Sequence, residues 1–312
     1  MSSSPDLLRT ALAPCTTYAF DLDDTLHSFR AASSAAATAV FEYIVASTNT
    51  ENPTLLHQPG DKAAATTTID VPRLRALYAT ILKAKTANAF ADGATRTSDD
   101  YRKERFAALL HAAGLSLADP PSPSPPSAPS SSPSPNDATD ELELESSPYL
   151  TALAATYKTA LRASLALKPG AAPLLRALKA RPGRRVVVVT EGPRDAQLWT
   201  LRELGLLKET GGFVDEVVTT GDVGRAKVEE GFWGEVLRRV GGGDRVLRAE
   251  EVAVVGDSWE RDVVPAREAG CVVVWYCEGG GDGAGAGEGR DGVLRVDALD
   301  RLREAVETES GV

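Results

Sequence analysis

A cluster of aspartates at the end of a short apolar run constrains this chain more than any other feature. Residues 18–20 read Tyr-Ala-Phe, which is typical of the end of a buried strand. Asp21, Asp23 and Asp24 follow within four residues. Aspartate is disfavoured inside strands, so we expect the strand to end here with its acids at its carboxyl end, where open α/β sheets bind ligands. The alternative is a solvated acidic turn between a strand and a helix.

Three carboxylates at one strand end repel one another unless a cation lies between them. Oxygen ligands of this kind suit a hard ion such as Mg²⁺. The acidic strand end therefore predicts a magnesium site, provided that later parts of the chain supply partners for it.

From residue 169 onward the chain alternates between apolar, β-branched runs and helical segments. Repeated βα units imply a parallel sheet with right-handed crossovers. The predicted fold is therefore α/β, with a Rossmann-like, doubly wound parallel sheet as its core. We expect later strands at 186–189, 213–219, 252–255 and 272–276, and helices at 171–180, 196–204, 232–240, 263–269 and 296–306.

The segment between the first strand and the rest of the sheet predicts an inserted all-helical cap domain. No convincing strand pattern occurs from residue 27 to 165, and helices are expected at 31–45, 71–85, 99–113 and 149–165. We expect a loop at 46–70, and a helix start capped by Ser98. Residues 117–147 are rich in proline, serine and acids and predict a disordered loop. The predicted domains are thus a core of 1–30 and 166–312 and a cap of 31–165.

Composition excludes several classes of function. Of the 312 residues 43% are hydrophobic, enough for a sizeable core, and the net charge of −10 argues against a nucleic-acid partner. No apolar run is long enough to span a membrane, and we see no signal peptide. Three cysteines form no metal-ligand pattern; Cys15 and Cys271 are predicted core residues, and a reduced, cytoplasmic setting is expected.

Polar residues also follow the later strands. Thr190 ends the strand at 186–189, and a hydroxyl beside backbone N–H groups can hold a phosphate oxygen. Lys227 follows the strand at 213–219 and could offset the carboxylates. Gly256-Asp257-Ser258 ends the strand at 252–255, with Asp262 beyond it. Taken singly, the threonine is explained as a helix cap and the loop lysine as a solvated charge. Together with Asp21, Asp23 and Asp24 they predict one site.

The four strand ends together resemble a known family, the haloacid dehalogenase-like hydrolase superfamily. The resemblance covers residues 17–30 and 165–277, and the helical insert resembles the C1-type cap of subfamily I. Its motifs are, in order, Asp21-Leu22-Asp23-Asp24-Thr25, then Thr190, then Lys227, and finally Gly256-Asp257-Ser258 with Asp262.

This resemblance implies a role for each matched residue. Asp21 would be the nucleophile and form an aspartyl-phosphate, and Asp23 would protonate the leaving alcohol and then activate water. Thr190 would bind phosphate oxygens, and Lys227 would neutralise charge. The metal ligands would be Asp21, the backbone carbonyl of Asp23, and Asp257, with Asp262 as an outer or alternative ligand of Mg²⁺.

The resemblance also implies a reaction, hydrolysis of a small phosphorylated metabolite. Dehalogenases of the family lack an acid two residues after the nucleophile, because halide needs no proton, so Asp23 favours phosphate esters. A sugar phosphomutase with the same cap class is an alternative that keeps all four motifs. A catalytically silent binding or scaffold protein of the same fold is another.

Two groups of residues are candidates for holding the substrate. Glu191 and Gly192 follow Thr190 where the family commonly has Asn-Gly, and a carboxylate there would repel phosphate unless it were paired, for which Arg194 is the candidate. In the cap, one predicted helix combines aromatic and cationic side chains, although a solvated helix face is the plainer reading. These cap candidates are Tyr101, Arg102, Arg105 and Phe106. His27 could touch the substrate, but a helix-start residue is the plainer account.

Overall fold

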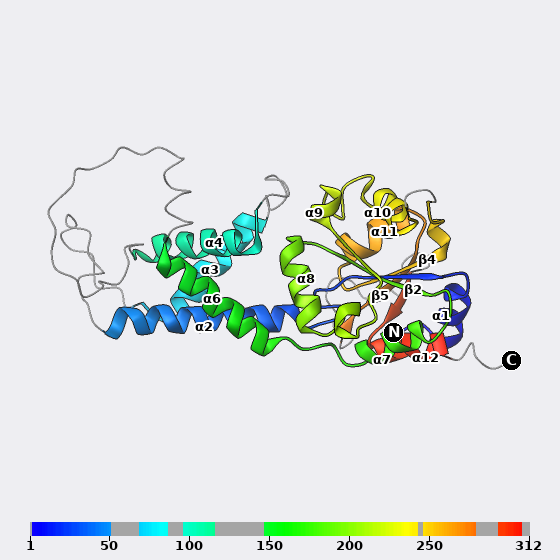
Figure 1. Cartoon of the computed structure of the whole chain (residues 1–312), viewed down its shortest axis with the longest axis horizontal. Helices are drawn as coiled ribbons and strands as arrows, with labels where there is room; N and C mark the ends of the chain where they lie inside the picture. The colour runs from blue at the N-terminus through cyan, green and yellow to red at the C-terminus, as the bar shows by residue number, and fades with distance from the viewer. Residues whose placement is uncertain are drawn as a thin grey trace. The chain divides into compact units, whose positions relative to one another are not determined.

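A computed structural model of the chain (Figure 1) describes residues 2–50, 69–86, 96–115, 147–242, 246–278 and 293–307. The described residues form two compact units, one within Met1–Arg30 and Leu165–Val312 and the other within Ala31–Ala91 and Arg96–Ser164. The predicted disordered segment lies outside the described residues except for residue 147.

The first unit is built on a six-stranded sheet whose order is β3-β2-β1-β4-β5-β6. Every pairing is parallel, and β1 lies at the centre with Ala19 opposite both Val187 and Val254. The predicted doubly wound parallel sheet is therefore confirmed. Its strands are β1 (Thr17–Phe20), β2 (Arg185–Thr190), β3 (Glu216–Thr219), β4 (Val252–Gly256), β5 (Val272–Tyr276) and β6 (Leu294–Val296).

Both faces of this sheet are buried, which explains why its strands read as continuous apolar runs. Successive residues of β1 point to opposite faces: Tyr18 and Phe20 join one hydrophobic core, and Ala19 joins the other. Helices α1 (Pro5–Leu12), α7 (Ala171–Lys179), α8 (Arg194–Glu203) and α12 (Leu299–Glu307) supply the first core. Helices α10 (Phe232–Val240) and α11 (Val264–Glu268) supply the second, and Figure 1 shows them across the sheet from α7 and α12.

Three segments differ from the sequence prediction. Residues 294–296 form β6 against β5, so the final helix begins at Leu299 rather than at 296. The three residues of β6 are held by backbone pairing at a sheet edge, a contact that local pattern does not reveal. Strand β3 begins at Glu216 rather than 213, and the loop predicted after it contains a short helix, α9 (Thr220–Val223). Thr219 and Asp222 form a capping box that nucleates this turn.

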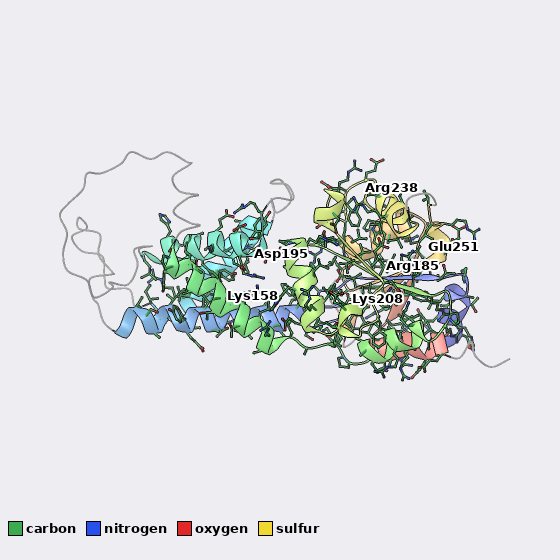
Figure 2. The ribbon with its side chains drawn as sticks, in the orientation of Figure 1. Lys158, Arg185, Asp195, Lys208, Arg238 and Glu251 are labelled. Carbon is green, nitrogen blue, oxygen red and sulfur yellow. The ribbon has the colours of Figure 1, made fainter. Side chains whose placement is uncertain are left out.

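The amino ends of β2 and β3 meet at an ionic cluster centred on Asp215. Lys179 lies 2.8 Å and Lys208 2.8 Å from its carboxylate oxygens. The backbone N–H of Val186 donates to the same carboxylate at 2.8 Å. Lys208 is labelled in Figure 2, as is Arg185, which pairs with Glu216 at 2.9 Å. Asp215 thus has two cations for one negative charge, and its pKa falls to about 2 because these hydrogen bonds outweigh the effect of burial.

The second unit is helical throughout its described residues. It contains α2 (Phe29–Thr50), α3 (Val71–Thr86), α4 (Ser98–Ala113) and α6 (Pro148–Ser164). A chain of aromatic contacts crosses its core, with ring centroids 5.5 Å apart for Phe41 and Tyr78, 5.8 Å for Tyr78 and Phe106, and 6.0 Å for Phe106 and Tyr157. None of the described helices is both long and apolar enough to cross a membrane.

Two helix ends in this unit correct the sequence prediction. The cap of α4 is Thr97 rather than Ser98, because Thr97 and Asp100 form a reciprocal capping box. Helix α2 continues to Thr50, five residues into the predicted loop, since no glycine or proline interrupts it before Pro53.

Candidate active site

Three carboxylates gather at the carboxyl ends of the two central strands. Asp21 follows β1, and Asp257 and Asp262 follow the neighbouring β4. One carboxylate oxygen from each lies within 4.8 Å of the others. Because β1 and β4 are parallel neighbours, residues distant in sequence are brought to one point of the sheet edge. The oxygens form a donor set of the kind that hard divalent cations prefer.

Lys227 is buried inside this acidic group. Its Nζ lies 2.6 Å from Asp21 Oδ1 and 2.7 Å from Asp262 Oδ1, and only 2% of its side chain is exposed. Burial alone would lower the pKa of Lys227, but the two carboxylates raise it above its usual range. The pKa of Asp21 is itself raised well above its usual range by burial, against the lowering effect of Lys227. One ammonium therefore does not balance the acids around it.

Asp262 is held in place by the turn that follows β4. Its Oδ2 accepts a hydrogen bond from the backbone N–H of Ser258 at 3.0 Å, so both of its oxygens have partners. Gly256 makes this packing possible, because a Cβ at that position would lie 2.4 Å from the Cβ of Asp262. A glycine is therefore required here for space rather than for an unusual backbone conformation.

Asp257 is fixed through its backbone and faces a cation through its side chain. Its carbonyl accepts a hydrogen bond from Trp275 Nε1 at 3.0 Å, and the rings of Trp275 and Trp259 pack with centroids 5.1 Å apart. Trp259 is thus a packing residue. The carboxylate lies 3.1 Å from Arg30. Burial, with the charge of Asp262, nevertheless raises the pKa of Asp257 above its usual value.

Asp23 points away from this group toward His27. Its Oδ1 lies 2.8 Å from His27 Nε2, and its Oδ2 lies 3.4 Å from Gln197 Nε2. The carboxylate of Asp23 therefore lies outside the three-acid cluster. This fits the expectation that Asp23 would bind the metal through its backbone carbonyl rather than through its side chain. His27 is completely buried. Sequence reasoning placed His27 at a helix start and missed this contact.

The residues at the carboxyl end of β2 include one acid, Glu191, that is paired with a cation. Thr190 is fully buried at the strand end. Gly192 adopts a positive φ of 117°, a backbone conformation that favours glycine, and a Cβ there would lie 2.9 Å from Gln197 Nε2 and displace the end of that side chain. Glu191 is paired with Arg261 at 3.1 Å. The predicted partner, Arg194, instead pairs with Asp222.

The four cap candidates lie on α4 in the helical unit, where Phe106 is fully buried in the core. The guanidinium of Arg102 lies 2.6 Å from Asp99 and stands 5.5 Å from the ring centroid of Tyr157, so it is engaged inside that unit. Tyr101 packs against Arg96, whose guanidinium carbon lies 4.7 Å from the centroid of the ring. A role for these side chains in binding substrate stays a prediction.

Comparison with known proteins agrees with this geometry. A model of the haloacid dehalogenase-like hydrolases matches residues 15–270. The glyceraldehyde 3-phosphate phosphatase of Methanocaldococcus jannaschii is 33% identical over 124 residues, which are 40% of this chain and 50% of that protein. The chain thus spans about half the length of this curated relative.

Solved structures share the fold at lower identity. The magnesium-bound structure of YfnB from Bacillus subtilis has a TM-score of 0.56 at 20% identity, covering 94% of this chain and 98% of the other. A 2-haloacid dehalogenase from Pseudomonas syringae has a TM-score of 0.56 at 19% identity, covering 95% and 100%. At such identities the likeness concerns the fold alone. The family match over most of the chain confirms the resemblance of the four motifs: this chain belongs to the haloacid dehalogenase-like hydrolases.

Proposed function

We propose that this protein is a Mg²⁺-dependent phosphatase that hydrolyses a small phosphomonoester through an aspartyl-phosphate on Asp21. The observation that carries the proposal is the contact of Lys227 with Asp21 at 2.6 Å, beside a second acid, Asp23, two residues on. A buried carboxylate next to a fixed cation is an oriented nucleophile, and the second acid supplies the proton that an alcohol leaving group needs.

Each step is assigned to a side chain of this chain. Asp21 Oδ attacks phosphorus, and the bond from phosphorus to the ester oxygen breaks. Asp23 gives its proton to that oxygen, and then removes a proton from the water that hydrolyses the aspartyl-phosphate. Lys227 keeps one positive charge beside the attacking oxygen throughout, where negative charge collects during phosphoryl transfer. Thr190 and the backbone N–H groups near Gly192 are the proposed phosphate donors.

The acidic cluster suits a magnesium ion. Its donors are carboxylate oxygens, and they outnumber the buried ammonium that faces them. We assign Asp21, Asp257 and the backbone carbonyl of Asp23 as ligands, with Asp262 in an outer position because Lys227 and Ser258 already occupy its oxygens. When bound, the ion would supply positive charge to the phosphoryl oxygens.

Asp23 also separates this proposal from dehalogenation, the reaction named for one structural neighbour. Displacement of halide needs no general acid, whereas the carboxylate of Asp23, a quarter exposed, is oriented here by its contact with the buried His27. The phosphatase of Methanocaldococcus jannaschii, matched over 124 residues, further supports a small phosphorylated substrate.

The test is release of inorganic phosphate from p-nitrophenyl phosphate and a panel of phosphorylated metabolites, with and without Mg²⁺. We expect turnover that requires Mg²⁺ and that Asp21→Asn, a nearly isosteric change, abolishes. Asp6→Asn is the matched control, because Asp6 is an exposed carboxylate on α1 of the same unit. Activity that survives Asp21→Asn would refute the mechanism. A wild type that only exchanges phosphate between sugar positions would be a phosphomutase, and an inert wild type would favour a binding protein.

A further inference from the structure

His27 is the buried partner of the proposed acid and base, Asp23. Its imidazole is completely buried, and Nε2 lies 2.8 Å from Asp23 Oδ1. The second ring nitrogen, Nδ1, has no hydrogen-bond partner among the described residues. Leaving a buried polar atom unpaired costs about 1–3 kcal/mol, so packing alone gives no reason to keep a histidine here.

The backbone around His27 fixes the position of the ring. The His27 N–H donates to the carbonyl of Leu22 at 3.2 Å, and its own carbonyl accepts from the N–H of Asp24 at 2.8 Å. Asp24 completes this tight turn with a φ of 64°, a left-handed value that is uncommon outside glycine. The backbone of His27 also forms a β-bridge with Leu167, so the backbone of this residue is held by two segments of the chain.

The chemistry of the contact defines which atom donates. A carboxylate can only accept, so His27 Nε2 carries the hydrogen whenever Asp23 is ionised. When Asp23 is protonated, Oδ1 still accepts from His27 if the proton resides on Oδ2. Because the contact to His27 is the shorter of the two that Asp23 makes, Oδ1 is the oxygen that accepts from His27 in both protonation states. Oδ2 has a longer contact, 3.4 Å to Gln197 Nε2, and is the oxygen left to exchange a proton.

We infer that His27 is a positioning residue that holds Asp23 through Oδ1 so that Oδ2 delivers the proton to the leaving group. The inference rests on the proposed phosphatase function. In the step that it affects, Asp21 forms a bond to phosphorus, the bond from phosphorus to the ester oxygen breaks, and that oxygen takes the proton from Asp23 Oδ2. Without the contact to His27, Asp23 keeps its chemistry but loses its fixed orientation.

Leaving-group dependence distinguishes this role from a purely structural one. 2,4-Dinitrophenolate leaves without a proton, whereas phenolate and alkoxides need one. The quantity to measure is kcat/KM for 2,4-dinitrophenyl phosphate and for phenyl phosphate, since kcat/KM reports the first transition state rather than later hydrolysis of the aspartyl-phosphate. The ratio of the two values is independent of the fraction of enzyme that is folded.

Two variants of His27 carry the test. His27→Phe keeps a planar ring but removes the donor, whereas His27→Gln keeps an N–H donor with similar reach. We expect His27→Phe to lower kcat/KM roughly 10- to 100-fold for phenyl phosphate, because a general acid contributes about 10²–10⁴-fold and the variant loses part of that contribution. For 2,4-dinitrophenyl phosphate, which needs no proton, we expect a loss of under about 3-fold. We expect His27→Gln to recover most of the kcat/KM that His27→Phe loses on phenyl phosphate. Asp23→Asn removes the acid itself, so it should show the largest difference in loss between the two esters.

Equal losses on both esters in His27→Phe, or no loss on either, would overturn the inference. The inference would also be overturned if His27→Gln lost as much kcat/KM on phenyl phosphate, relative to 2,4-dinitrophenyl phosphate, as His27→Phe does. These results leave the proposed phosphatase intact, provided that Asp21→Asn is inactive. A wild type inert toward both esters, or an active Asp21→Asn, contradicts the proposed function itself and removes the basis for a role of His27.

Discussion

The two ends of the same parallel sheet carry ionic clusters with opposite charge balance. At the amino end, Asp215 has two lysines and a backbone N–H, and its pKa falls to about 2. At the carboxyl end, Lys227 alone is buried among the carboxylates of Asp21 and Asp262, and burial raises the pKa of Asp21. The first cluster has more cations than carboxylates. In the second, the three carboxylates of Asp21, Asp257 and Asp262 face one buried lysine and the exposed Arg30.

This difference indicates which cluster stabilises the fold and which one, under the proposed function, binds a ligand. A carboxylate with a lowered pKa stabilises the folded state near neutral pH, whereas a buried carboxylate with a raised pKa costs stability there. Proteins retain such a cost at sites where another cation or a substrate completes the charge balance. The carboxyl end of the sheet is also where ligands bind in this architecture.

The largest expected effect follows from removing the buried cation. Lys227→Met leaves the buried carboxylates of Asp21 and Asp262 without the cation that contacts both, so we expect a loss of about 3–5 kcal/mol in the free energy of unfolding at pH 7. Lys179→Met is the matched change at the other end, where Asp215 keeps Lys208. We expect that variant to lose about 2 kcal/mol or less. Urea unfolding measures both, and equal losses would contradict the proposed difference in charge balance.

Magnesium is expected to stabilise the protein through the carboxyl-end cluster only. At a free concentration about 100 times its Kd, a ligand that binds only the folded state adds about 2.7 kcal/mol to the free energy of unfolding. Calorimetric titration gives the Kd, and urea unfolding with and without Mg²⁺ gives the gain. Asp257→Asn should remove most of it, whereas Asp215→Asn should retain it. A gain that persists in Asp257→Asn would place the ion elsewhere.

The amino-end cluster predicts a stability difference that depends on pH. The pKa of Asp215 is lowered from its ordinary 3.8 to about 2. Its stabilisation is thus complete above pH 4 and is lost as the pH falls toward 2. We expect Asp215→Asn to lose about 2 kcal/mol at pH 7 and roughly half of that at pH 3. Urea unfolding at the two pH values measures the change, and a loss that does not vary with pH would show that charge pairing is not its cause.

The smallest expected effect concerns the partner of Glu191. Arg261 is half exposed, so Arg261→Ala should cost under about 1 kcal/mol of stability. Under the proposed function, however, the freed carboxylate of Glu191 would repel the phosphate and raise KM several-fold. The double variant Arg261→Ala with Glu191→Gln should restore KM. If the single variant has an unchanged KM, Glu191 does not face the substrate.

The sequence predicted the α/β alternation well because strands buried on both faces are marked by runs such as 186–189. The carboxyl-end residues followed from the same reasoning, since parallel strands place their ends at one edge. Asp21, Asp257 and Asp262 lie where the strand ends predicted, with Lys227 between two of them.

What the sequence could not predict depends on contacts between distant segments. Glu191 is paired with Arg261 rather than with nearby Arg194, which is held by Asp222 instead. His27 contacts Asp23 across a turn in which Asp24 adopts a left-handed conformation, which is uncommon for residues other than glycine and is not marked in the sequence. Strand β6 exists because β5 offers an edge, and three residues are too few for a pattern.

The most direct test of the central claim is to trap the phosphorylated enzyme. Wild-type protein is mixed with Mg²⁺ and 2,4-dinitrophenyl phosphate, quenched in acid within the first turnover, and analysed by intact and peptide mass spectrometry. The account predicts the added mass of one phosphoryl group, located on Asp21 and missing in Asp21→Asn. Phosphate found on another residue, or turnover with no phosphorylated protein at any time point, would contradict it.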